Sequence, residues 1–294
     1  MRLPIIISRF SNLLFFIQKT SQSRLASFDL QKYLDENLDI SFYGGSESEI
    51  WKQISKSIGK RDAEQFKKAI IPIKSVFAPH WEKASKNLSL WEKYFQDNSE
   101  LFEQIILDIK VLSNVKDFLV SKIPIYLVSD SQSDGKDINA WFSWTPKQSF
   151  VVVEIPIGLK VADNLFQIGI LAHEYFHLVL KKNKKLVLQI NQIAEENNEL
   201  LEKISKRDVS NKMFFEELLI SSFVPEGYLS EKYFGFKVAT DIYNPKDLLD
   251  WRKLVASEMR RLAEKYINNS QQIDKKYLGQ LIKVIKQNIK QKPS

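Results

Sequence analysis

The sequence predicts an α+β protein that is predominantly helical and contains a small mixed sheet. Apolar residues recur at three- and four-residue spacing along most of the chain, a pattern typical of helices. Between residues 124 and 155, short runs of β-branched and aromatic residues are separated by turn residues, which indicates strands. The chain has 294 residues, of which 44% are hydrophobic and 12% aromatic, and this is sufficient for a packed core.

Residues 1–115 are expected to form a mostly helical N-terminal region. Its first apolar runs, Ile5–Ile7 and Leu13–Ile17, are interpreted as a buried strand leading into a helix. An export signal is disfavoured because Arg9 and Asn12 interrupt the runs and no small-residue cleavage site follows. A short strand is predicted at 40–43, and Pro72 is expected to end one of the helices. The helices are predicted at 11–21, 46–58, 62–71, 79–95 and 99–113.

Residues 116–294 are expected to form a second region with the strands and the remaining helices, and the two regions are also compatible with one compact domain. Strands are predicted at 124–128, 138–144 and 150–155. Asp163 is a plausible N-cap for a helix that runs to Lys182. Further helices are predicted at 184–206, 213–223, 246–267 and 271–290.

Charge and cysteine content restrict the partners and the chemistry. The net charge is +7, but 43 basic residues are dispersed among 36 acidic ones, so no nucleic-acid partner is expected. No stretch approaches the roughly 20 apolar residues that span a bilayer, so no membrane association is expected and the cytoplasm is the predicted location. The absence of cysteine excludes disulfides and thiolate ligands, so any metal must be held by nitrogen and oxygen.

The most informative motif is His173-Glu174-Tyr175-Phe176-His177 within an apolar run. Side chains four residues apart lie on the same face of a helix, so His173 and His177 can present two imidazole nitrogens to one ion. Glu174 lies beside them, where its carboxylate can accept a proton from a water molecule that the ion activates. The motif therefore predicts a zinc site with Glu174 as the general base.

A catalytic zinc usually has three protein ligands and one open position, which leaves the third ligand to be found. His80, the remaining histidine, lies far upstream. Glu196 lies 19 residues after His177, a favourable spacing, but its surroundings are polar. Glu217 and its neighbour Glu216 lie in an apolar helix, where a carboxylate is costly unless it is paired or binds a metal. Glu217 is preferred, because Ser221 lies one turn later and can hydrogen-bond a ligand; Glu216 and Glu196 remain alternatives.

These residues resemble the gluzincins, the thermolysin-like zinc peptidases. The resemblance rests on the His-Glu-x-x-His motif, on Glu217 with Ser221 as a later ligand helix, and on the strand Asn139-Ala140-Trp141-Phe142. It covers about residues 124–230 and implies a zincin-like fold with an edge strand next to the motif helix. It also implies that Asn139 and the backbone of Ala140 bind the substrate main chain by strand addition.

The sequence departs from that family in places. The family's Asn-Glu-x-x-x-Asp and Trp-Leu-x-Glu-Gly motifs are absent from this chain, and no downstream histidine is present to stabilise a transition state. A tyrosine serves this purpose in some branches, and Tyr228, just after the ligand helix, is the candidate here. The expected function is hydrolysis of a peptide or protein substrate. The alternative is a metal-stabilised or inactive binding or regulatory protein that uses the N-terminal helices.

Overall fold

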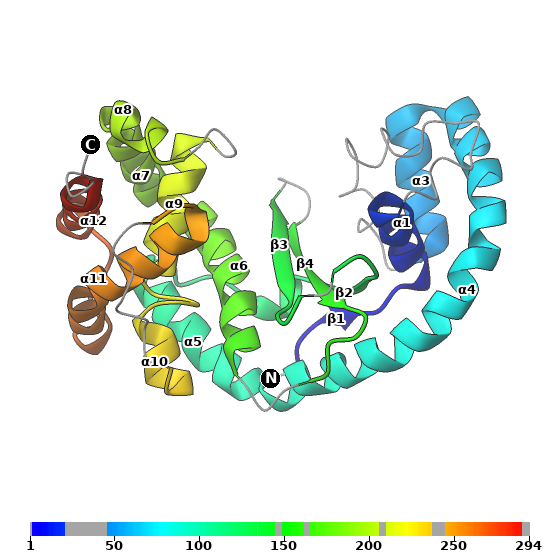
Figure 1. Cartoon of the computed structure of the whole chain (residues 1–294), viewed down its shortest axis with the longest axis horizontal. Coiled ribbons are helices and arrows are strands. Elements are labelled where there is room, and N and C mark those ends of the chain that lie inside the picture. The colour runs from blue at the N-terminus through cyan, green and yellow to red at the C-terminus, as the bar shows by residue number, and fades with distance from the viewer. Residues whose placement is uncertain are drawn as a thin grey trace. The chain divides into compact units, whose positions relative to one another are not determined.

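The computed structural model describes residues 2–20, 46–133, 135–144, 149–161, 165–205, 210–236 and 245–289. Helices predominate in these residues and four strands form one mixed sheet, which confirms the α+β class (Figure 1). The chain divides into two compact units. The sheet unit comprises Met1–Ser99 and Leu119–Asp163, and the helix unit comprises Glu100–Phe118 and Asn164–Ser294. The strand predicted at 40–43 and the cap predicted at Asp163 lie outside the described residues.

The sheet has the strand order β1-β2-β4-β3. Its strands are β1 (Ile5–Ile6), β2 (Ile125–Asp130), β3 (Asn139–Trp144) and β4 (Ser149–Pro156). The first three strands of that order run parallel, and β3 pairs antiparallel with β4, so β3 is an edge strand. The three strands predicted between residues 124 and 155 are confirmed.

Helix α1 (Arg9–Lys19) packs against β2. Phe15 of this helix joins side chains of β2 and β4 in a hydrophobic cluster that covers one face of the sheet. The cluster consists of Phe15, Tyr126, Val128, Phe150 and Val152. The strand-then-helix interpretation of the first residues is therefore confirmed.

A buried asparagine links α1 to β2. Asn12 donates a hydrogen bond from Nδ2 to the carbonyl of Leu127 at 3.1 Å, and its Oδ1 accepts one from the N–H of Ser129 at 2.9 Å. β1 pairs with β2 only at Ile125 and Tyr126. Because a buried backbone group without a partner is costly, the asparagine satisfies β2 where β1 has already ended.

The rest of the sheet unit consists of α3 (Glu47–Ile58), α4 (Lys60–Asp97) and the short 3-10 helix η3 (Val120–Lys122). α3 begins with a capping box, in which Ser46 accepts from the N–H of Glu49 and the Glu49 carboxylate accepts from the N–H of Ser46. α1, α3 and α4 share a second hydrophobic cluster that includes Phe66 and Phe77.

Pro72 does not end a helix, so that prediction is wrong. α4 continues through Pro72 and Pro79 as one long, curved helix (Figure 1). Both prolines lie on the exposed face, where water can bond the carbonyl groups that proline leaves without a donor. Ile70, Ile73 and Phe77 are buried on the opposite face and hold the helix in place.

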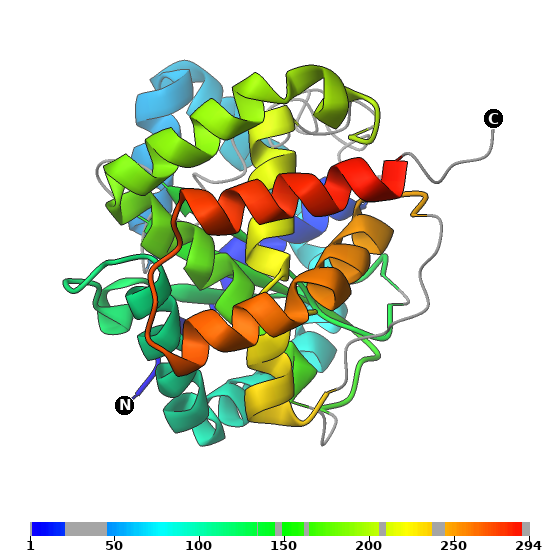
Figure 2. The same cartoon turned by 90° about the vertical axis from the view of Figure 1, so that its left-hand side faces the viewer.

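The helix unit contains eight helices among the described residues. They are α5 (Ser99–Leu112), α6 (Phe166–Lys182), α7 (Lys184–Glu196), α8 (Asn198–Glu202), α9 (Asn211–Ser221), α10 (Tyr228–Phe234), α11 (Leu248–Asn268) and α12 (Lys275–Ile289). α9 packs against α6, α7, α8 and α11. α11 and α12 lie side by side (Figure 2). The helix predicted at 184–206 is in fact two, because Asn197 ends α7 by donating from Nδ2 to the carbonyl of Ile193.

The two units divide the chain differently from the regions expected at 1–115 and 116–294. β2 pairs with β1 and packs against α1, so the sheet belongs with the N-terminal helices. Local spacing indicates where a strand lies but does not say which distant strand it pairs with. Within the described residues, no helix has the length and apolar character that crossing a membrane requires.

Candidate metal centre

Helix α6 carries the His-Glu-x-x-His motif in the interior of the helix unit. Thirteen of its residues, from Gln167 to Leu180, are buried, which fits a sequence that is apolar on nearly all sides. The rings of Phe102 and Phe118 meet Tyr175 edge-on and help to fix the rotation of the helix. His173, Glu174 and His177 are consequently held at low exposure, with His177 fully buried.

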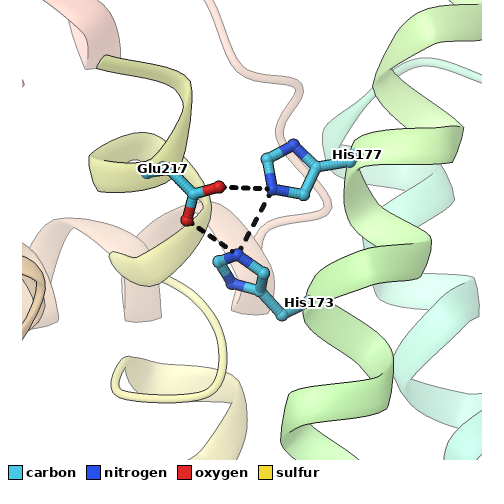
Figure 3. Close-up of side chains that lie close together, drawn as sticks. All are labelled: His173, His177 and Glu217. Carbon is cyan, nitrogen blue, oxygen red and sulfur yellow. Dashed lines mark hydrogen bonds and ion pairs between the residues drawn. The ribbon is translucent and has the colours of Figure 1, made fainter. Parts of the chain in front are cut away.

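Helix α9 supplies a carboxylate to the two histidines. Oε2 of Glu217 lies 3.0 Å from Nε2 of His173, and Oε1 lies 3.1 Å from Nε2 of His177. The two Nε2 atoms are 3.3 Å apart. Figure 3 shows the three side chains pointing toward one another from α6 and α9. One ligand atom from each lies within 4.8 Å of the others, so His173, His177 and Glu217 form a group that can hold a metal ion.

The other ring nitrogen of each histidine faces an acceptor. Nδ1 of His173 lies 3.1 Å from the carbonyl oxygen of Val224, in the segment after α9. Nδ1 of His177 lies 2.7 Å from Oε1 of Glu216. A carbonyl and an ionised carboxylate can only accept, so we assign the proton of each neutral imidazole to Nδ1. Each Nε2 atom is then unprotonated and carries a lone pair.

The inner face of the group therefore brings together acceptors only. Two Nε2 lone pairs and the Glu217 carboxylate lie within hydrogen-bond distance of one another, in a site from which water is largely excluded. Acceptors in such contact repel unless a cation lies between them, either a proton or a metal ion. The donor set of two imidazoles and one carboxylate fits a metal site, in which outer hydrogen bonds fix the histidine tautomers.

The pKa shifts describe the group when protons fill that role. Burial opposes a charge on His177, but its hydrogen bonds to Glu216 and Glu217 outweigh that effect and raise its pKa to about 9. Burial opposes ionisation of Glu217 as well, yet its bonds to His173 and His177 hold its pKa well below the usual range. Burial raises the pKa of Glu174, and the positive charges of the histidines and Arg252 offset this rise only in part.

Two basic residues complete the surroundings, and the sequence analysis identified neither. Lys181, one turn after His177 on α6, donates to both oxygens of Glu216 at 2.9 and 2.8 Å. Arg252 on α11 lies with Nη1 3.8 Å from Oε2 of Glu217 and with Nη2 3.0 Å from Oε1 of Glu226. Lys181 follows His173 and His177 at four-residue intervals, so the sequence indicates that it shares their face of the helix. No comparable pattern in the sequence points to Arg252.

The formal charges around the group leave room for a divalent ion. Four carboxylates, when ionised, face two permanent cations, which leaves two negative charges. The carboxylates are Glu174, Glu216, Glu217 and Glu226, and the cations are Lys181 and Arg252. Because isolated buried charge is costly, a dipositive ion or two bound protons would balance the site.

No protein-family model, curated protein or solved structure matches the chain. The resemblance to the gluzincins therefore rests on the motifs of the sequence alone.

The remaining predicted site residues belong to other elements than α6 and α9. Asn139 and Ala140 are on the edge strand β3 of the sheet unit, where Nδ2 of Asn139 donates to Oε2 of Glu154 at 3.2 Å. Their role in binding substrate stays a prediction. Tyr228 begins α10, and its ring lies 5.7 Å from the guanidinium carbon of Arg260. Its role also stays a prediction.

The alternatives for the third ligand and its support lie as follows. Glu196 is exposed at the end of α7 and accepts a hydrogen bond from Gln192. Glu216 is buried and bonds the outer nitrogen of His177, so it contacts a candidate ligand from outside and does not join the inner face. Ser221 has a buried hydroxyl that lacks a hydrogen-bond partner among the described residues, so the supporting role expected of it falls to Glu216.

Proposed function

We propose that the protein is a zinc-dependent peptidase. The observation that carries this proposal is the convergence of two imidazole lone pairs and the Glu217 carboxylate, with a further carboxylate, Glu174, beside them on α6. A zinc ion held by His173, His177 and Glu217 would polarise a substrate carbonyl and lower the pKa of a water molecule. The protein's own residues supply the remaining steps.

Glu174 is the proposed general base. Burial raises its pKa above the ordinary carboxyl value, so the carboxylate is a stronger proton acceptor. Glu174 takes the proton of the attacking water as the carbon–oxygen bond forms. It then delivers that proton to the leaving amine as the carbon–nitrogen bond breaks. No other group is needed to carry the proton.

The number of ligands favours catalysis over a purely structural role. Within the described ranges, the group that can hold a metal contains three side chains. Structural zinc sites are usually closed by four protein ligands, whereas catalytic sites leave a position for water or substrate. The metal-stabilised binding protein, which the sequence left as the alternative, would need a fourth protein ligand.

The test combines metal analysis with peptide cleavage. We expect one zinc per chain by elemental analysis, and cleavage within a mixed-peptide library followed by mass spectrometry. Glu174→Gln should retain the zinc and lose at least about a thousandfold in activity, because it removes the proton acceptor but none of the ligands. Glu217→Ala should lose both.

Matched controls separate chemistry from folding. Glu199→Gln changes an exposed glutamate on α8 and should leave zinc content and cleavage unchanged. The circular dichroism spectrum and thermal unfolding of each variant are compared with those of the wild type, to check that the variant is folded. Equal cleavage by the wild type and Glu174→Gln would refute the peptidase proposal, and so would a chain that binds no zinc.

A further inference from the structure

Arg252 is a half-buried cation beside the candidate metal centre, and part of its hydrogen-bonding capacity is unused among the described residues. Its side chain is 20% exposed, so part of the guanidinium reaches solvent. Nη2 donates to Oε2 of Glu226 at 3.2 Å, which fixes one end of the fork. Nε is buried and has no hydrogen-bond acceptor among the residues that the structure describes.

The contact of Arg252 with the metal ligand is electrostatic only. Nη1 lies 3.8 Å from Oε2 of Glu217, which is within ion-pair distance but too long for a hydrogen bond. Glu217 already directs its two oxygens to His173 and His177. Glu226 thus holds the guanidinium in place, and Glu217 accepts no hydrogen bond from it.

An unsatisfied buried donor is costly, and arginine presents its N–H groups in a planar fork that matches a carboxylate. The N–H groups of Arg252 that Glu226 does not bind therefore require a second acceptor. None of the described residues provides it.

We propose that Arg252 binds a carboxylate of the substrate next to the reacting peptide bond. The carboxylate comes either from the free C-terminus of a peptide or from an aspartate or glutamate side chain. Both present the same planar anion to the fork. This inference rests on the proposed peptidase function, since it places the substrate beside the zinc ligands. It makes acidic or C-terminal peptides the preferred substrates.

The experiment measures binding rather than turnover. Zinc-loaded Glu174→Gln protein is titrated calorimetrically with pooled hexapeptides in three matched forms. The first form has a free C-terminus, the second a C-terminal amide, and the third an amidated C-terminus with one internal aspartate in place of asparagine. We expect at least about a tenfold gain in affinity for the first or the third form over the second, as for a charge-assisted hydrogen bond. The form that gains identifies the source of the carboxylate.

Added to the Glu174→Gln background, Arg252→Gln should abolish the gain. Arg252→Lys should keep part of it, because the charge remains without the fork. Arg261→Gln changes an exposed arginine on the same helix and should keep all of it. Equal affinity for the three forms, or a gain that persists in Arg252→Gln, would overturn the inference. Zinc content and wild-type cleavage are measured in parallel, so a carboxylate preference without cleavage refutes the peptidase proposal alone.

Discussion

Glu216 lies between His177 and Lys181, and its Oε1 contacts both of them. It accepts from Nδ1 of His177 at 2.7 Å and from Nζ of Lys181 at 2.9 Å. Glu216 is 4% exposed, so these contacts are the main stabilisation of its carboxylate. Glu216 thus links the candidate ligand His177 to a partly exposed lysine one turn along the same helix.

Glu216→Gln should weaken zinc binding by about 10- to 100-fold. The substitution keeps the shape of the side chain but removes the negative charge that fixes the tautomer of His177 and raises its basicity. The dissociation constant is measured by competition with a chromogenic chelator. Glu199→Gln, on the exposed surface of α8, serves as the control. An unchanged dissociation constant would show that Glu216 does not support the ligand.

Lys181→Met should destabilise the metal-free protein by about 1–3 kcal/mol, because it leaves a buried carboxylate with one partner fewer. The lysine side chain is 23% exposed, so the loss should be smaller than for a fully buried pair. Urea denaturation provides the measurement, with the exposed Lys184→Met as control. Combining Lys181→Met with Glu216→Gln should restore part of the loss. If the two effects simply add, the pair is not coupled.

Zinc binding at pH 7 should release protons. In the metal-free protein His177 has a pKa of about 9, so at pH 7 it carries a proton that zinc must displace. Affinity should therefore rise with pH, by about tenfold per unit for each displaced proton, and level off above about pH 9. Calorimetry in two buffers with different ionisation enthalpies counts the protons. An identical heat in both buffers would contradict this expectation.

Gly227→Ala should disrupt the segment that orients His173. A Cβ at position 227 would overlap the backbone of Ser222 and Phe223, so the chain from Ser222 to Gly227 would have to move, and Val224 with it. We expect a loss of stability of about 1–3 kcal/mol together with weaker zinc binding. Gly279→Ala is the control. A Cβ there meets nothing within 4 Å, so this change should stabilise α12 by about 0.5–1 kcal/mol.

Glu154→Ala should loosen the edge strand β3. Glu154 is 5% exposed and accepts from Asn139, from Nε1 of Trp141 at 2.9 Å and from Nζ of Lys19 at 3.2 Å. Its removal leaves three donors without this acceptor and should cost about 1–3 kcal/mol. Amide exchange in β3 should increase more than in β2. The exposed Glu82→Ala is the control, and equal protection of β3 in both variants would contradict the assignment.

The sequence predicted the elements whose local pattern is decisive. The motif on α6 has a fixed spacing, and Glu217 is recognisable because a carboxylate in an apolar helix needs a partner. The continuity of α4 was not predictable from Pro72, because the residue itself does not tell whether it lies on the exposed or the buried face of a helix.

The surroundings of the site were harder to predict, because they depend on tertiary packing. Arg252 follows Glu217 by 35 residues and looks like an ordinary surface arginine until α11 packs against α9. The carbonyl of Val224 carries no sequence information at all. The break at Asn197 depends on a side-chain bond to Ile193 that competes with continuation of the helix.

The side-chain amide of Asn12 occupies the edge of β2 at Leu127 and Ser129, beyond the end of β1, and makes the hydrogen bonds that a neighbouring strand would make. It offers β2 one donor and one acceptor, as a neighbouring backbone would, so an extended chain cannot add to β2 at Leu127 and Ser129. A single side chain thereby protects a hydrophobic strand from unwanted pairing. At its other edge the sheet ends with β3, and the binding of an extended peptide there stays a prediction.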